Sequence, residues 1–160
     1  MKRLWAPWRK EYVGELFRRQ DGDCFLCLKH QESDDEANFV LWRGRTAYAL
    51  MNVYPYNSGH LLPCIEDLTE EEISELGSMV KVLVRALKRA YDPQGFNVGA
   101  NLGRAAGAGV PEHLHLHLVP RWNGDTNFMP VIGEVKVISE SLEDTFARLK
   151  GHISELLGSG

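Results

Sequence analysis

The stretch EHLHLHLVPRW, residues 112–122, is the most regular part of the chain, because three histidines occupy every second position with leucines between them. In a β-strand, successive side chains point to opposite faces, so His113, His115 and His117 would share one face and the leucines the other. The pattern therefore predicts a strand with an apolar core face and a row of imidazoles.

Two chemistries fit such a row of imidazoles. A neutral imidazole can attack phosphorus and form a phosphoramidate that water or phosphate then cleaves. Alternatively, two or three of the histidines could hold a zinc ion whose bound water attacks. A solvated polar strand face is a third possibility. For an isolated strand of this kind, the spacing favours metal over nucleophile and excludes neither.

Composition narrows the class of protein. The 160 residues are 44% hydrophobic and 25% charged, which fits one globular domain over residues 1–160. The formal net charge of -4 gives no basic footprint for a nucleic-acid polymer, although a small nucleotide needs only local positive charge. The chain contains neither a long apolar run nor a signal peptide's apolar middle region. We expect a cytoplasmic protein with a small-molecule substrate and no membrane partner.

Short apolar runs bounded by Pro, Gly and Asn predict strands at 38–42, 46–52, 60–64, 95–102, 113–119 and 135–138. Thr69 and Glu72 form a capping box before a helix that ends at Asp92. The helix has apolar positions at intervals of three and four: Ile73, Leu76, Val80, Leu83, Leu87 and Tyr91. A second helix begins near Ser141. These elements predict an α+β fold, with a mainly antiparallel sheet, one long helix and a C-terminal helix.

A loop rich in small residues, GRAAGAGVPE at 103–112, leads into the histidine strand. Its glycines do not match the dinucleotide fingerprint GxGxxG, and no helix follows. Gly107 and Gly109 would let backbone N–H groups approach an anion closely, although a turn that needs positive φ also explains them. Because the loop adjoins the histidines, we favour a phosphate-binding role.

The histidine strand resembles the signature of the histidine-triad family, in which three histidines alternate with hydrophobic residues. The continuation PRWNGDTNFMP is similar to the family's dinucleoside polyphosphate branch, and the resemblance extends to residues 49–62, residues 95–109 and the opening LWAPWR. It implies a nucleotidyl hydrolase or transferase that cleaves at an α-phosphorus through a nucleotidyl-histidine, with no metal in the chemistry. We expect diadenosine tetraphosphate as the substrate and a homodimer as the assembly.

The resemblance also implies roles for four histidines. The middle histidine of the triad, His115, would be the nucleophile. His113 and His117 would position it and hold phosphate oxygens. His60 matches the family's fourth active-site histidine, which lies on a neighbouring strand beside the triad.

Two asparagines extend this implied site. Asn52 matches the family's ribose-contacting asparagine, and Asn101 lies where the family places an amide on the α-phosphate; either could instead bond its own backbone. The chain departs from many relatives at Gly109 and Val110, where they have Gln and a Ser or Thr. Without that hydroxyl donor, the resemblance does not indicate whether water or phosphate is the acceptor.

Cys24 and Cys27 form a CxxC motif. In relatives with this motif, the two cysteines join a histidine beside the triad and a later histidine around a structural zinc. Here the segment after the fourth active-site histidine is shorter, and that later histidine is missing. Zinc could bind Cys24, Cys27 and His113, with Cys64 or Glu66 nearest to the fourth position, but two buried cysteines without a metal fit the motif equally well.

Three other functions stay open at this point. Within the family, the alternative is a nucleoside phosphoramidase. From other classes, the rivals are a module that binds adenine nucleotides without turnover and a zinc hydrolase that uses the triad as ligands. The presence of His115 together with His60 and Asn52 favours catalysis over binding, and the CxxC motif gives zinc a place away from the triad.

Overall fold

The structure is a computed structural model that describes residues 24–110, 113–133 and 137–159. Its strands form one five-stranded sheet, in the order β1-β2-β3-β5-β4, and every neighbouring pair is antiparallel. The LWAPWR opening lies outside the described residues, as do residues 135 and 136 of the last expected strand. Val137 and Ile138, the rest of that expected strand, are not in a strand.

The strands are β1 (Val40–Arg43), β2 (Ala47–Met51), β3 (Leu61–Ile65), β4 (Gly95–Ala100) and β5 (Leu114–Arg121). Each overlaps an expected strand, because short apolar runs between turn residues favour extended backbone. The predicted α+β class with an antiparallel sheet is confirmed. The bounds differ from the expected ones by up to two residues at either end.

The long helix α3 (Glu70–Tyr91) begins at the predicted capping box. The Thr69 hydroxyl accepts from the Glu72 N–H at 3.2 Å, and the Glu72 carboxylate accepts from the Thr69 N–H at 3.1 Å. The predicted apolar stripe was partly wrong: Ile73 is 51% exposed, whereas Met79 and Ala86 are fully buried. The buried face of α3 therefore passes through Leu76, Met79, Leu83, Ala86 and Leu87.

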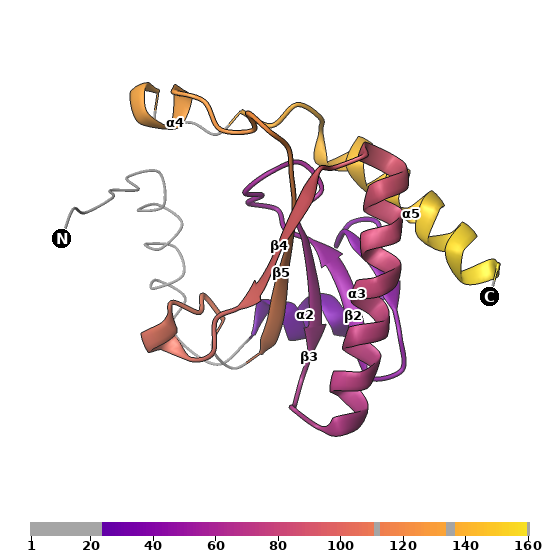
Figure 1. The fold of residues 1–160 in the computed structure, drawn as a ribbon. Helices are drawn as coiled ribbons and strands as arrows, with labels where there is room; N and C mark the ends of the chain where they lie inside the picture. Colours follow the sequence, from indigo (N-terminus) through magenta and orange to yellow (C-terminus); the bar gives the residue numbers. More distant parts are fainter. Residues whose placement is uncertain (1–23, 111–112, 134–136, 160) are drawn as a thin grey trace.

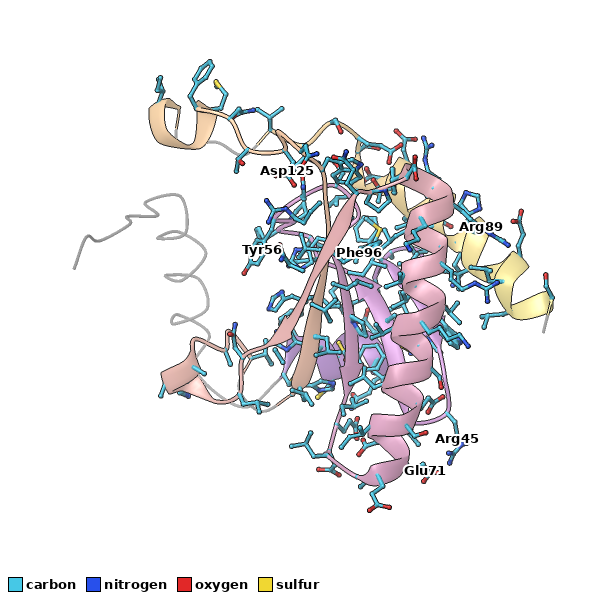
Figure 2. All side chains as sticks on the ribbon, in the orientation of Figure 1. Arg45, Tyr56, Glu71, Arg89, Phe96 and Asp125 are labelled. Atoms are coloured by element: carbon cyan, nitrogen blue, oxygen red, sulfur yellow. The ribbon has the colours of Figure 1, made fainter. Side chains whose placement is uncertain are left out.

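The C-terminal helix α5 (Leu142–Gly158) begins after Ser141, whose hydroxyl accepts from the Asp144 N–H at 3.1 Å. Figure 1 shows α5 beside α3, and Figure 2 shows Phe96 between β4 and α3. The main core packs both helices against one face of the sheet and includes Leu118, with Leu114 and Leu116 against it. The leucine face of the histidine strand therefore lies in the core, as predicted.

The opposite face is partly covered by α2 (Phe25–Gln31), a helix that was not predicted from the sequence. Two other short helices, η1 (Arg104–Ala106) and α4 (Met129–Ile132), were also not predicted. None of the described helices has the length and apolar character to cross a membrane.

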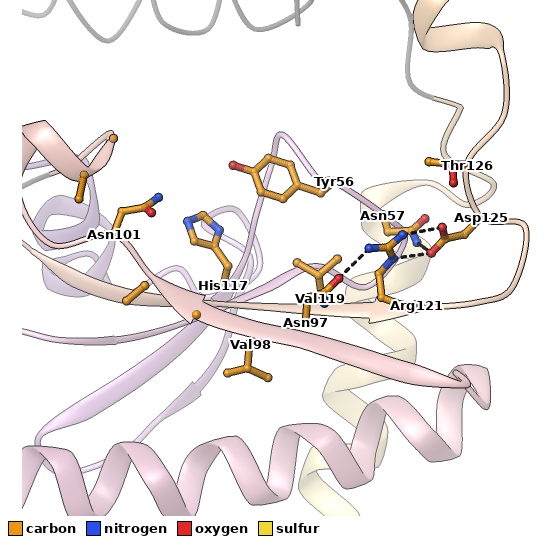
Figure 3. A pocket seen from close by; sticks show the side chains of 14 residues that line it. Tyr56, Asn57, Asn97, Val98, Asn101, His117, Val119, Arg121, Asp125 and Thr126 are labelled. Carbon is orange, nitrogen blue, oxygen red and sulfur yellow. Dashed lines mark hydrogen bonds and ion pairs between the residues drawn. The ribbon is translucent and has the colours of Figure 1, made fainter. Parts of the chain in front are cut away.

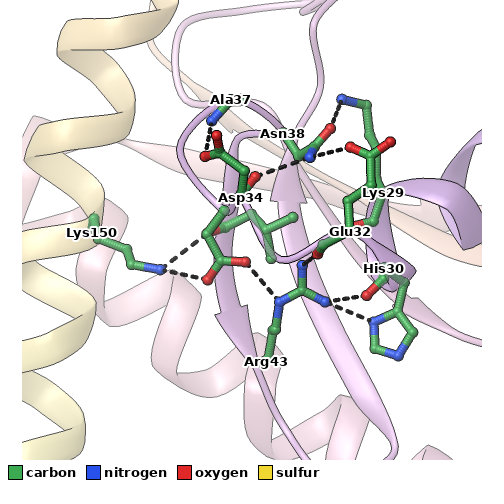
Figure 4. Close-up of polar contacts among 10 residues, drawn as sticks. Lys29, His30, Glu32, Asp34, Ala37, Asn38, Arg43 and Lys150 are labelled. Carbon is green, nitrogen blue, oxygen red and sulfur yellow. Dashed lines mark hydrogen bonds and ion pairs between the residues drawn. The ribbon is translucent and has the colours of Figure 1, made fainter.

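A polar network holds α2 against β1 (Figure 4). The Arg43 guanidinium donates to the backbone carbonyls of Lys29, His30 and Glu32 and to the carboxylate of Asp35. The last carbonyls of a helix lack intrahelical partners, so an arginine that binds several of them fixes the helix end. Arg43 thereby positions α2, which carries Cys27.

Candidate active site

The histidine strand β5 lies between β3 and β4, with Cys64 opposite His115 and Gly99 opposite His117. His113 and His115 are buried, and His117 is half-buried. On one side of the strand the leucines enter the main core, and on the other the rings of His115 and His117 meet edge to face at 5.2 Å. The strand therefore presents its imidazoles on the face away from α3.

The protonation of the middle histidine follows from one contact. His115 Nδ1 lies 2.9 Å from the carbonyl oxygen of His113. A carbonyl oxygen can only accept, so Nδ1 carries the hydrogen, and the Nε2 of a neutral ring has a free lone pair. His115 is thereby held in the tautomer that a nucleophilic nitrogen requires.

Two consecutive hydrogen bonds connect His60, the fourth histidine, to the triad. The Tyr56 N–H, which can only donate, lies 3.1 Å from His60 Nδ1. His60 Nδ1 is therefore an acceptor, and His60 Nε2–H donates to His117 Nδ1 at 3.0 Å. Neutral His117 then carries its hydrogen on Nε2 and can donate it to a ligand oxygen.

Asn52 fixes the other side of His60. Its carbonyl oxygen accepts from the Tyr54 N–H at 2.9 Å, so its amide nitrogen faces His60 Nδ1 at 3.2 Å. The structure thus brings Asn52 next to His60, where its amide orients the imidazole. A ribose contact by Asn52 remains a prediction.

Burial, followed by the nearby His117 and His115, lowers the pKa of His60 to about 3. The folded protein therefore keeps His60 neutral at a pH where the unfolded chain, with a pKa of about 6.5, takes up a proton. The unfolded state binds more protons in this range, so the stabilisation is present above about pH 6.5 and is lost as the pH falls toward 3.

We therefore expect the lowered pKa of His60 to reduce the free energy of unfolding by about 2 kcal/mol when the pH is lowered from 7.5 to 5. Urea unfolding at the two pH values should show this loss in the wild type and a loss smaller by that amount in His60→Gln. His152→Gln, on α5, controls for the removal of one imidazole elsewhere. An identical pH dependence in wild type and His60→Gln would contradict the assignment.

A second cluster surrounds the ring of His113. The ligand atoms of Cys24, Cys27 and His113 all lie within 4.8 Å of one another, and Cys27 Sγ lies 3.1 Å from His113 Nδ1. The Tyr48 hydroxyl donates to the Leu26 carbonyl at 2.9 Å, so it accepts from His113 Nε2–H at 3.1 Å. That contact leaves the Nδ1 lone pair facing the cysteines, as a metal ligand requires.

These contacts bear on the two roles predicted for His113. Both of its ring nitrogens bond within the protein, which leaves neither for a phosphate oxygen, so that predicted contact has no support in the geometry. Its backbone carbonyl, however, positions His115. Burial lowers the pKa of His113, which favours the neutral ring that a metal ligand requires.

The cluster found among the described residues has three ligands and includes neither Cys64 nor Glu66. The Cys64 thiol is fully buried and donates to the Leu62 carbonyl at 3.3 Å, and burial raises its pKa. Burial and the adjacent Cys24 also raise the pKa of Cys27, to about 11. A metal ion would therefore have to displace a firmly held proton from Cys27.

A groove of about 900 Å³ lies beside the triad (Figure 3). At one end it is lined by His117, Asn101 and Gly107, so the structure brings together three of the predicted site residues. Gly107 has a φ of 88°, in the left-handed region that favours glycine. Other predicted residues do not line this groove: Asn52, His60, Gly109, His113 and His115.

Two tyrosines of the site were not predicted from the sequence. The Tyr56 ring stacks on His117 at 5.5 Å and 14°, and Tyr48 orients His113. Tyr48 could have been found, because it alternates with Leu50 and Asn52 along one strand and so shares their face. Tyr56 lies in a loop, where no periodicity indicates its position.

The sequence profile of the HIT domain matches residues 35–124, from the loop before β1 to the turn after β5. The chain belongs to the HIT family. This HIT protein is 41% identical over 157 residues to a protein named AP-4-A phosphorylase from Mycobacterium tuberculosis, with 91% of this chain and 80% of the relative covered. The family membership predicted from the histidine strand is confirmed.

Two further relatives of the HIT protein extend the comparison. An asymmetrical bis(5'-nucleosyl)-tetraphosphatase from Schizosaccharomyces pombe is 30% identical over 93 residues, which cover 54% of this chain and 50% of the relative. Among solved structures, a zinc-bound histidine triad family protein from Mycobacterium smegmatis matches with a TM-score of 0.65 and 20% identity, covering 85% of this chain and 96% of that one. The structural match supports the HIT fold alone.

Proposed function

We propose that this HIT protein is an enzyme that cleaves dinucleoside polyphosphates by nucleotidyl transfer to His115. The observation that carries the proposal is the 2.9 Å contact from His115 Nδ1 to the His113 carbonyl, which leaves Nε2 as the free nucleophile. The name of the 41% identical relative, AP-4-A phosphorylase, supports diadenosine tetraphosphate as the substrate.

In the first step, His115 Nε2 attacks the α-phosphorus, a P–N bond forms, and the bond to the bridging oxygen breaks. A nucleoside polyphosphate leaves. In the second step, an oxygen of water or orthophosphate attacks the same phosphorus, and the P–N bond breaks. The nucleophile is an imidazole lone pair, so neither step requires a metal among the reacting groups.

Neighbouring groups stabilise the phosphate charge in this proposal. The bond from His60 to His117 Nδ1 places the hydrogen of neutral His117 on Nε2, which would donate to a phosphate oxygen in this proposal. Asn101 lines the groove beside His117 and offers its amide as a further donor. The backbone N–H groups of residues 106–108 donate within the loop, to the carbonyls of Gly103 and Arg104, at 3.0 to 3.3 Å. Gly109 extends the same glycine loop toward β5.

Orthophosphate should change the products of the reaction. Gly109 and Val110 supply no hydroxyl, so the nucleotidyl-histidine is open to more than one acceptor. We expect diadenosine tetraphosphate to give AMP and ATP in water, with ADP replacing AMP as orthophosphate is added. Anion-exchange chromatography of the products measures the shift, and sulfate at equal ionic strength is the control. An AMP yield that is indifferent to phosphate would identify a pure hydrolase.

We also propose that Cys24, Cys27 and His113 hold a structural zinc ion, separate from the reacting groups. The mutual distances of the three ligand atoms and the free Nδ1 lone pair of His113 support this role. Zinc at this site would tie α2 to β5. Free cysteines persist in reducing compartments, which supports a cytoplasmic location.

A homodimer is the proposed assembly. The strand β4 forms an edge of the sheet, and its residues 97–100 are exposed, including Val98 at 51%. An exposed edge strand can pair with the same strand of a second copy through its backbone N–H and C=O groups.

A further inference from the structure

The groove extends beyond His117 to a second polar group of side chains, at the ends of β4 and β5 (Figure 3). We call it the distal cluster, and it consists of Asn97, Arg121, Asp125 and Thr126. None of these residues takes part in the chemistry proposed above. The distal cluster therefore needs an explanation of its own.

The distal cluster carries no net charge. Arg121 Nε and Nη2 donate to the two carboxylate oxygens of Asp125, at 2.6 and 2.8 Å. Such a bidentate pair is rigid, and its two charges neutralise each other. The Asp125 carboxylate also accepts from the Asn57 amide at 2.8 Å and from the Trp122 N–H at 3.1 Å. Because Arg121 is already paired, this end of the groove is poorly suited to binding phosphate.

The distal cluster nevertheless presents open hydrogen-bonding groups. The Asn97 carbonyl oxygen accepts from Arg121 Nη1 at 2.7 Å, which fixes the amide and leaves its NH₂ group with no partner in the described part of the chain. The Thr126 hydroxyl likewise has no hydrogen bond among the described residues. Both side chains line the groove and are exposed. They can bind the hydroxyls of a sugar or the edge of a base.

The groove between the triad and the distal cluster has apolar lining residues. It includes Val119 and the glycine at position 99, where an added Cβ would meet nothing within 4 Å. Neutral, hydrogen-bonding and partly apolar surfaces match a nucleoside better than a polyphosphate chain.

We propose that the distal cluster binds the second nucleoside of the substrate, the one that leaves with the displaced polyphosphate. This inference rests on the function proposed above. In this arrangement, the phosphates lie by His117, Asn101 and the glycine loop, and the departing nucleoside lies between Val119 and Asn97. The groove then selects substrates with two nucleosides over mononucleotides with the same phosphate chain.

The test compares diadenosine tetraphosphate with adenosine 5'-tetraphosphate, which has the same number of phosphates and one nucleoside. The measured quantity is the ratio of the two kcat/KM values. Wild type should favour the dinucleoside substrate, and Asn97→Ala should lower the ratio about tenfold, the loss expected for one hydrogen bond. Thr126→Val should also lower this ratio, whereas Thr126→Ser, which keeps the hydroxyl, should leave it close to that of wild type. Asn123→Ala, the same change on the adjacent turn outside the groove, is the matched control.

Two results would overturn the proposal: a wild type without preference for the dinucleoside, or an Asn97→Ala variant that loses both activities equally. A wild type that cleaves neither substrate would instead refute the proposed function. In that case calorimetric binding of the two compounds still tests the role of the distal cluster. Wild type should bind the dinucleoside compound more tightly than the mononucleoside compound, and this difference should be smaller in Asn97→Ala. Circular dichroism establishes that each variant is folded.

Discussion

Replacement of His115 by alanine should lower kcat for diadenosine tetraphosphate on the order of 10⁴-fold or more, because the group that forms the covalent bond is removed. Nucleotide binding should persist, since His117, Asn101 and the backbone around Gly107 still line the groove. The two effects separate a nucleophile from a residue that only binds substrate.

The measurements are single-turnover cleavage and calorimetric binding of the same substrate. In wild type, substrate labelled at the α-phosphate should transfer label to the protein on rapid quenching, and His115→Ala should remain unlabelled. His152→Gln, a change of a partly buried histidine on α5, is the matched control and should retain both turnover and labelling. Turnover in His115→Ala close to that of wild type would refute the mechanism.

Removal of zinc should lower the free energy of unfolding, and this is the second large effect that we expect. If Cys24, Cys27 and His113 hold zinc, free zinc a thousandfold above its dissociation constant adds about 4 kcal/mol to the free energy of unfolding. The rate per folded molecule should change little. The metal would bind the ring of His113, whereas His115 is held by the backbone carbonyl of that residue.

Urea unfolding followed by circular dichroism, after metal removal verified by elemental analysis, measures this increment. Cys24→Ser combined with Cys27→Ser should abolish it, and Cys64→Ser should keep it, because Cys64 is buried outside the cluster. A product assay on the same samples gives the rate. If folded, metal-free protein loses its rate and zinc restores it, the triad holds a catalytic zinc instead.

Local patterns predicted most of the fold. The alternation at 113–118 placed the leucines in the core correctly, because side-chain direction in a strand depends only on a period of two. The Thr69 capping box and the Ser141 cap marked helix starts within one residue, since each cap uses residues three apart. These features need no knowledge of distant contacts.

The parts that the sequence did not reveal depend on contacts between distant segments. The helix α2 has seven residues, too few for a clear periodicity, and is held by Arg43 through side-chain bonds to its end. The orientation of His113 depends on Tyr48, which is 65 positions away. The pairing of Arg121 with Asp125 is local, but its place at the end of a groove follows only from the packing of β4 beside β5.

The hydrogen bonds from Tyr56 through His60 to His117 all run in one direction. This series of hydrogen bonds begins at the Tyr56 backbone N–H, which cannot accept, and His60 is only 1% exposed. A proton therefore has no route backward through His60 to solvent. His117 also lines the groove, so a ligand bound there would cover its outer face and slow proton exchange between the reacting phosphate and solvent until the leaving nucleotide departs.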